Sequence, residues 1–221
     1  MTIEEAIPLR HSVRQYQPTP LTPEQVEKVQ NKISELNEAH GLSMQLILND
    51  DEAFNSRMAH YGSFRGVRNF VAVVGPKNPT LSERAGHALA QLILYVQTLG
   101  LNTCIAAMTF KKTANINICD GEAIVVAIAL GVGQTQGVQH SMKPASRIAP
   151  GYDNAPDWFK KGIDTVLMAP SAINQFRATF VANEDGSVTA KARLGLYTKV
   201  DLGIFKYYFE LGAGTENFRW K

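Results

Sequence analysis

The chain has 221 residues, a length that allows one large domain or two small ones with a full hydrophobic core. Apolar residues make up 45% and charged residues 19% of the chain, as is ordinary for a globular protein. The net charge of +2 provides no overall field that would indicate nucleic acid or a membrane surface as a partner.

The cysteine content and the chain start indicate the cellular compartment. Cys104 and Cys119 form no Cys-x-x-Cys pair and imply no disulfide framework, and their small or apolar neighbours predict two buried thiols. Residues 1–5 show no basic region leading into an apolar run, so we expect no signal peptide. The longest apolar stretches, such as 123–132, are far shorter than the ~20 residues of a membrane span. We therefore expect a cytoplasmic protein.

A cluster of basic residues follows the first short helix, which we expect over residues 3–9. On an extended segment Arg10, Ser12 and Arg14 would share one face, and His11 would point to the other. A hydroxyl between two guanidinium groups suits a phosphate monoester, which offers several acceptor oxygens. The pattern alone is equally compatible with a solvated basic patch.

The first half of the chain then alternates helices and strands. Thr22, Pro23 and Gln25 are typical of a helix start, and Gly41 is typical of a helix end. The apolar patterns predict, in order, a helix to about residue 40, a strand over 43–49, a helix over 51–60, a loop over 61–68, a buried strand over 69–75, a largely buried helix over 81–99 and a buried loop or short strand over 101–108.

The second half contains an adjacent hairpin. The predicted elements are a fully buried strand over 123–133, a polar arm over 134–156, a helix over 155–168, strands over 176–182 and 188–192, and a helix over 197–211. Asn183 to Gly186 is a turn sequence between the two strands. We therefore expect a single domain over residues 1–221 with an α+β fold, in which helices flank a mixed, mainly antiparallel sheet.

A helix-terminating stretch, Ala169 to Gln175, carries the second polar cluster. Its Pro170-Ser171 break directs the following residues across the end of the helix. Asn174 both donates and accepts hydrogen bonds, which suits the edge of a heterocycle or a ribityl chain. Local hydrogen bonds of an ordinary loop would give the same residue types.

Together, Arg-x-Ser-x-Arg and Ala-Pro-Ser-Ala-x-Asn-Gln resemble the FMN-dependent nitroreductase family. Gly100-Leu101-Asn102-Thr103-Cys104 is similar to the Gly-Leu-x-Thr-Cys segment of that family, and 130–133 is similar to the strand before its last phosphate contact. The Ala-Pro-Ser stretch comes about 160 residues after the basic stretch, whereas it follows soon after it in the commonest members. This order is similar to a compact, rearranged subgroup of the family.

The resemblance implies a set of cofactor-binding residues. The early stretch, residues 10–14, is expected to hold the flavin phosphate and ribityl chain. Either Lys143 or Arg147 is expected to make the last phosphate contact, and the spacing does not choose between them. The remaining residues are expected beside the isoalloxazine ring. The implied set is Arg10, His11, Ser12, Arg14, Ala106, Ala107, Lys143, Arg147, Pro170, Ser171, Ala172 and Asn174. Ala106 and Ala107 are equally compatible with ordinary core packing.

The resemblance implies a homodimeric enzyme that binds FMN and passes electrons from NAD(P)H to nitro compounds, quinones or similar acceptors. Neither a catalytic acid or base nor a metal is expected, because the flavin carries the chemistry and the five histidines lack a helical metal-site spacing. A flavin-binding or flavin-storage protein without turnover is the alternative, and only the response to NAD(P)H would distinguish the two.

Overall fold

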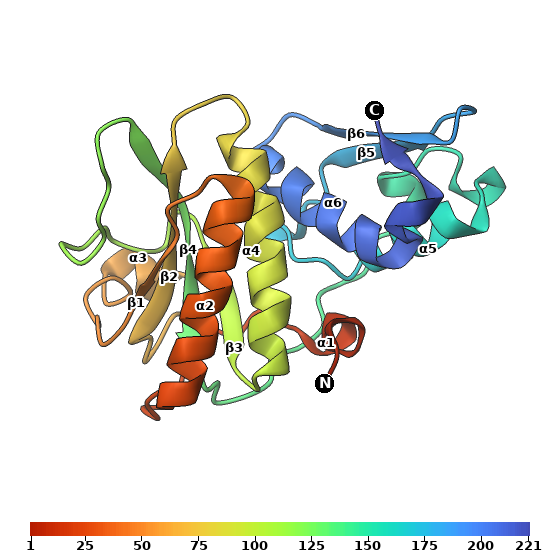
Figure 1. The fold of residues 1–221 in the computed structure, drawn as a ribbon. Helices are drawn as coiled ribbons and strands as arrows, with labels where there is room; N and C mark the ends of the chain where they lie inside the picture. The colour runs from red at the N-terminus through yellow and green to blue at the C-terminus, as the bar shows by residue number, and fades with distance from the viewer. The chain divides into compact units, whose positions relative to one another are not determined.

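The computed structural model describes residues 1–221. Its internal contacts divide the chain into two compact units. Figure 1 shows the chain coloured by residue number from the N-terminus to the C-terminus. Unit 1 comprises Met1–Leu81 and Leu92–Gln139, and unit 2 comprises Ser82–Gln91 and His140–Lys221. One helix, α4 (Leu81–Thr98), contributes to both units. A single domain over residues 1–221 stays a prediction.

Unit 1 is built on a four-stranded antiparallel sheet. Its strands are β1 (Gln45–Ile47), β2 (Asn69–Pro76), β3 (Asn102–Ala106) and β4 (Glu122–Gly131), in the order β1-β2-β4-β3. The register between β2 and β4 shifts between Val73 and Val74, as a β-bulge would produce. The uninterrupted apolar run of β2 is buried on both faces from Asn69 to Gly75, as its sequence predicts.

Two helices of unit 1, α1 (Ile3–Leu9) and α2 (Pro23–His40), begin and end at the predicted residues. The third, α3 (Arg57–Tyr61), begins six residues later than predicted. The Thr22 side chain accepts a hydrogen bond from the Gln25 amide, the Gln25 side chain bonds back to Thr22, and Gly41 adopts the left-handed conformation at φ 57°. In Figure 1, α2 lies along one face of the sheet, where it contacts β1.

The other face of this sheet carries a core cluster. Alternating residues of β2, β3 and β4 point to this side, where they pack against Phe54, Phe64 and Tyr16. The loops over 50–68 and 107–118 contribute the remaining apolar residues. The segments that bear most of the candidate residues of unit 1 are therefore anchored to a packed sheet.

Unit 2 combines helices with a small mixed sheet. It contains α5 (Asp157–Val166), α6 (Thr198–Ala213) and the strands β5 (Ala178–Ala182), β6 (Ser187–Ala192) and β7 (Arg219–Trp220). β5 and β6 form the predicted hairpin, and β7 adds in parallel to β6. Short 3-10 turns occur at Ala145–Arg147, Tyr152–Asn154, Ala172–Asn174 and Thr215–Asn217.

Glycines allow the helices of unit 2 to cross closely. A Cβ at Gly203 of α6 would collide with the Glu83 carbonyl of α4, and one at Gly86 would collide with the Val200 carbonyl. A cluster of aromatic rings fills the core beside them, including Phe180, Phe209 and Trp220. These contacts fix α6 as the central helix of unit 2.

The α+β fold with mainly antiparallel sheets is confirmed, and several local predictions are wrong. Residues 51–56 form turns instead of a helix, because the Asp50 carboxylate accepts the amide N–H groups of Glu52 and Ala53. Cys104 is buried as predicted, but Cys119 is exposed in a loop. The first half of β4 is only half-buried. No helix is long and apolar enough to cross a membrane.

Candidate functional site

The basic segment, residues 10–16, leaves α1 in an extended conformation and is held by backbone hydrogen bonds on both sides. The Val13 amide donates to the Thr103 carbonyl of β3 at 3.0 Å. The Arg65 amide donates to the Arg14 carbonyl at 2.9 Å, and the Tyr16 amide donates to the Arg65 carbonyl at 3.0 Å. The backbone of the segment is therefore fixed before any ligand binds.

Arg10, Ser12 and Arg14 lie near one buried thiol, Cys104 of β3. Burial raises the pKa of Cys104, while the charges of Arg14 and Arg10 and a hydrogen bond from Ser12 act to lower it. All three residues are therefore near enough to Cys104 to influence it, and a shared face of the segment stays a prediction. The Cβ of His11 would be 2.8 Å from a Cβ placed on Gly137.

Arg10 has an unsatisfied buried polar atom. The residue is only 4% exposed, and its Nε has no hydrogen-bond partner. A buried guanidinium N–H without an acceptor is costly, so native structures rarely contain one. An anion bound at this segment would supply the missing acceptor, and a phosphate offers several.

Tyr16 anchors the end of the segment, a role that the sequence did not reveal. Its hydroxyl donates to the Val13 carbonyl at 2.7 Å and to the Ala129 carbonyl at 3.3 Å. Burial raises the pKa of Tyr16 well above its ordinary value, so the phenol stays protonated and keeps donating. Gly66 packs against the backbone of this residue, since a Cβ on Gly66 would lie 2.6 Å from the Tyr16 carbonyl oxygen.

Ala106 and Ala107 mark the end of β3. Ala106 is buried, and Ala107 is half-buried at the start of a loop that extends to residue 121. Their place beside the sheet core agrees with the packing interpretation, and a contact with a flavin ring stays a prediction. The loop itself is tied down by Asp50, which accepts from Thr113 Oγ1 at 2.6 Å and from Asn115 Nδ2 at 2.8 Å.

Replacing Asp50 with alanine is expected to release this loop. Burial acts to raise the pKa of Asp50, but its hydrogen bonds outweigh that effect and the pKa is lowered, so the carboxylate is charged and accepts fully. Losing these bonds should lower the free energy of unfolding by about 2–3 kcal/mol. Urea unfolding would measure the loss, and trypsin should cleave the variant faster at Lys111 and Lys112.

The matched control for this change is Asp51→Ala, which removes the same charge from an exposed neighbour. It should leave both the free energy of unfolding and the cleavage rate nearly unchanged. Equal behaviour of the two variants would show that Asp50 does not hold the loop.

In unit 2 the predicted Pro170-Ser171 stretch forms a strained turn. Ile173, Asn174 and Phe176 have φ of 48°, 55° and 47°, in the left-handed region that β-branched and bulky residues rarely adopt. The Ile173 side chain is 91% exposed, and Asn174 Nδ2 donates to the Ser141 carbonyl at 3.0 Å. Backbone strain of this kind is found preferentially at functional sites.

A buried carboxylate of α6, Asp201, holds that turn in place. Its two oxygens accept from the Ala172 amide at 3.0 Å and from Gln175 Nε2 at 2.9 Å. Burial raises the pKa of Asp201 to about 6, and the two hydrogen bonds only partly offset this. The sequence offered no signal for Asp201, because its partners lie 26 and 29 residues away.

The two candidate phosphate contacts of unit 2 differ in what they already bind. Arg147 Nη2 donates to the Gln175 carbonyl at 3.2 Å, and the Arg147 carbonyl accepts from Arg193. Lys143 is half-buried and forms no hydrogen bond or ion pair. Lys143 therefore has its ammonium group available to a ligand, whereas Arg147 supports the strained turn.

The comparison with protein families decides the classification. A family model described as "Putative TM nitroreductase" matches residues 2–213. The chain belongs to this nitroreductase family. The match spans nearly the whole chain, so it includes both the basic segment of unit 1 and the strained turn of unit 2.

Solved nitroreductases share the fold. A putative nitroreductase from Thermotoga maritima is 19% identical, with a TM-score of 0.70 over 96% of this chain and 83% of that one. A putative nitroreductase from Desulfovibrio desulfuricans, in complex with FMN, is 19% identical, with a TM-score of 0.54 over 66% of this chain and 94% of that one. A putative NADH oxidase from Clostridium acetobutylicum is 15% identical, with a TM-score of 0.50 over 65% of this chain and 96% of that one. The curated proteins contain no match.

The predicted site residues of this nitroreductase-family chain fall into two groups. Unit 1 contains Arg10, Ser12 and Arg14, all near Cys104, with Ala106 on the strand that carries Cys104 and Ala107 directly after that strand. Unit 2 contains the others: Pro170, Ser171, Ala172 and Asn174 in the strained turn, Arg147 bonded to it through the Gln175 carbonyl, and Lys143. Their roles as cofactor contacts stay predictions.

Proposed function

We propose that the chain is an FMN-dependent oxidoreductase that takes electrons from NAD(P)H and passes them to nitro compounds, quinones or similar acceptors. The observation that carries the proposal is the buried Arg10 guanidinium, whose Nε has no partner in a segment pinned to the sheet. Membership of the nitroreductase family and the FMN complex of the Desulfovibrio protein support FMN as the cofactor.

The residues present fit a flavin phosphate. Arg10 and Arg14 provide two permanent charges with several N–H donors, and Ser12 adds a hydroxyl between them. Lys143 is the further cation that we propose at the phosphate, because nothing else engages it. When bound, FMN would supply the two-electron chemistry, while the protein binds, orients and shields it.

The strained turn is the second part of the proposed cofactor site. Ser171 and Asn174 provide a hydroxyl and an amide that can both donate and accept, as the polar edge of a flavin ring requires. Asp201 fixes the backbone between them. We propose that Pro170, Ser171, Ala172 and Asn174 contact the flavin, with Ala106 and Ala107 close to the ring.

The name of the Clostridium acetobutylicum protein, a putative NADH oxidase, agrees with a nicotinamide nucleotide as the electron source. We further propose a homodimer, as the resemblance implies, and a cytoplasmic location. The proposed acceptors are small molecules that carry a reducible nitro or quinone group.

Anaerobic reduction tests the proposed activity. The protein loaded with FMN should lose its visible flavin absorbance on addition of NADH or NADPH, and a nitroarene or quinone should then restore it. A spectrum that neither nucleotide changes would instead indicate a flavin-binding or storage protein without turnover. Comparing the two nucleotides in the same experiment also assigns the preferred donor.

A further inference from the structure

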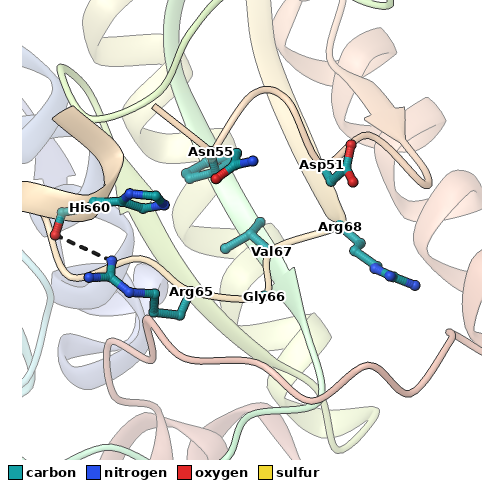
Figure 2. Close-up of a pocket in the computed structure, with 8 residues that line it drawn as sticks. Asp51, Asn55, His60, Arg65, Gly66, Val67 and Arg68 are labelled. Atoms are coloured by element: carbon teal, nitrogen blue, oxygen red, sulfur yellow. Dashed lines mark hydrogen bonds between the residues drawn. The ribbon is translucent and has the colours of Figure 1, made fainter. Parts of the chain in front are cut away.

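A pocket opens in unit 1 beside the basic segment. This Arg65–Arg68 pocket has a volume of about 290 Å³ and is lined by Asp51, Phe54, Asn55, His60, Arg65, Gly66, Val67 and Arg68 (Figure 2). Ligand pockets usually measure roughly 300–1,000 Å³, so this one is at the small end of the range. It has room for a single substituted ring but not for a whole dinucleotide.

The pocket has an apolar base and a polar rim. Phe54 and Val67 are buried, and the Phe54 ring stacks on Phe110 with centroids 6.3 Å apart. In Figure 2 the side chains of His60 and Asn55 point toward the space around Val67. A flat apolar body could therefore rest on the base while its polar groups meet the rim.

The charges of the rim favour an anion. Arg65 and Arg68 lie at opposite sides of the pocket, and Asp51 is the one carboxylate that lines it (Figure 2). Neither arginine forms an ion pair with Asp51, and the side chain of Arg68 forms no hydrogen bond; only its backbone carbonyl does, accepting from the Asp50 amide at 2.9 Å. Two guanidinium groups without a neutralising partner create a local positive potential that attracts anions.

Arg65 is held in position for such a contact. Its Nη1 donates to the Phe64 carbonyl at 2.7 Å and to the His60 carbonyl at 3.4 Å, as the dashed line to His60 in Figure 2 shows. The other N–H groups of the guanidinium remain available to a ligand. A pre-positioned arginine loses little entropy on binding, which makes its contact stronger.

The backbone links this pocket to the proposed cofactor segment. Arg65 exchanges backbone hydrogen bonds with Arg14 and Tyr16, at 2.9 and 3.0 Å. A ligand bound to Arg65 would therefore contact a residue that is itself hydrogen-bonded to the segment that we propose to hold FMN. This proximity favours a substrate over an unrelated ligand.

We propose that the Arg65–Arg68 pocket binds small aromatic carboxylates, and, resting on the proposed function, that those which also carry a reducible nitro or quinone group are the preferred acceptors. The ring rests on Phe54 and Val67, and the carboxylate is paired with the guanidinium of Arg65 or Arg68. The pocket would thereby select anionic acceptors over neutral ones of the same size.

Calorimetric titration with two matched probes tests the proposal on the purified full chain. 4-Nitrobenzoate carries the carboxylate, and 4-nitrobenzamide has the same size without the charge. We expect 4-nitrobenzoate to bind about ten-fold more tightly than the amide. Of the two variants Arg65→Gln and Arg68→Gln, the one that removes the guanidinium paired with the carboxylate should lose most of this preference. Arg57→Gln, which changes an exposed arginine outside the pocket, should retain it.

The outcomes separate this proposal from the proposed function. Equal affinity for both probes, or a preference that survives both pocket variants, overturns the pocket assignment whether or not the protein reduces either probe. Selective binding without any reduction by NAD(P)H keeps the pocket and contradicts the proposed function. Arg68→Gln is the safer variant, because the side chain of Arg68 has no hydrogen bond whose loss would disturb the fold.

Discussion

A double variant, Arg10→Met with Arg14→Ala, is expected to lose FMN while remaining folded. Each arginine would contribute charged hydrogen bonds to the phosphate, so their joint removal should weaken FMN binding by about 10²–10⁴-fold. Methionine keeps the apolar stem of Arg10 and removes its buried, unpartnered Nε. The free energy of unfolding should therefore change little. Titration of flavin fluorescence would measure the affinity.

The control for this variant is Arg57→Ala with Lys77→Ala, which removes two exposed positive charges elsewhere in unit 1. It should bind FMN as the unchanged protein does. Urea unfolding should give similar free energies for all three proteins, which shows that the loss of FMN is not a loss of structure. Equal FMN affinity in the double variant and its control would refute the assignment of the basic segment.

The free energy of unfolding should fall, relative to that of an Asp201→Asn variant, as pH rises from 3.8 to about 6. Burial raises the pKa of Asp201 in the folded state, so the folded protein holds its proton more tightly than the unfolded chain does. Below the unfolded pKa both states are protonated and there is no penalty. Above the folded pKa the full cost of the buried charge applies, about 2–3 kcal/mol.

Urea unfolding of both proteins across this pH range isolates the effect of Asp201. Other titrating groups, such as Asp50 and Asp185, are common to the two proteins and cancel in the difference. The difference between the two free energies of unfolding should change between pH 3.8 and about 6 and stay constant below and above this range. Parallel curves for the two proteins would show that Asp201 is not a buried, destabilised carboxylate.

Local sequence patterns predicted most of the fold. The Thr22 capping box, the Gly41 helix end and the Asn183–Gly186 turn each depend on residues within a few positions of each other. The sequence alone can therefore predict them. The buried strands β2 and β4 were visible because each has a long apolar run.

Long-range contacts account for what the sequence did not reveal. Asp50 binds Thr113 and Asn115, more than 60 residues away, and its turn replaces the first part, residues 51–56, of the helix predicted over 51–60. Asp201 supports a turn that precedes it by almost 30 residues. β7 is too short to show a strand pattern, and it forms only by adding to β6.

The sequence identified candidate cofactor-binding residues, but not the residues that hold their segments in place, such as Tyr16 and Asp201. Alternation predicts Arg10, Ser12 and Arg14 on one side, and all three are near enough to Cys104 to lower its pKa. The spacing did not choose between Lys143 and Arg147. The hydrogen bond from Arg147 to the Gln175 carbonyl now favours Lys143 as the free cation.

The most direct measurement is FMN uptake by the purified protein. After incubation with FMN and removal of free flavin by gel filtration, the protein should be yellow and carry about one FMN per chain, as one phosphate segment per chain implies. A colourless protein, with all the flavin in the low-molecular-weight fractions, would contradict the account.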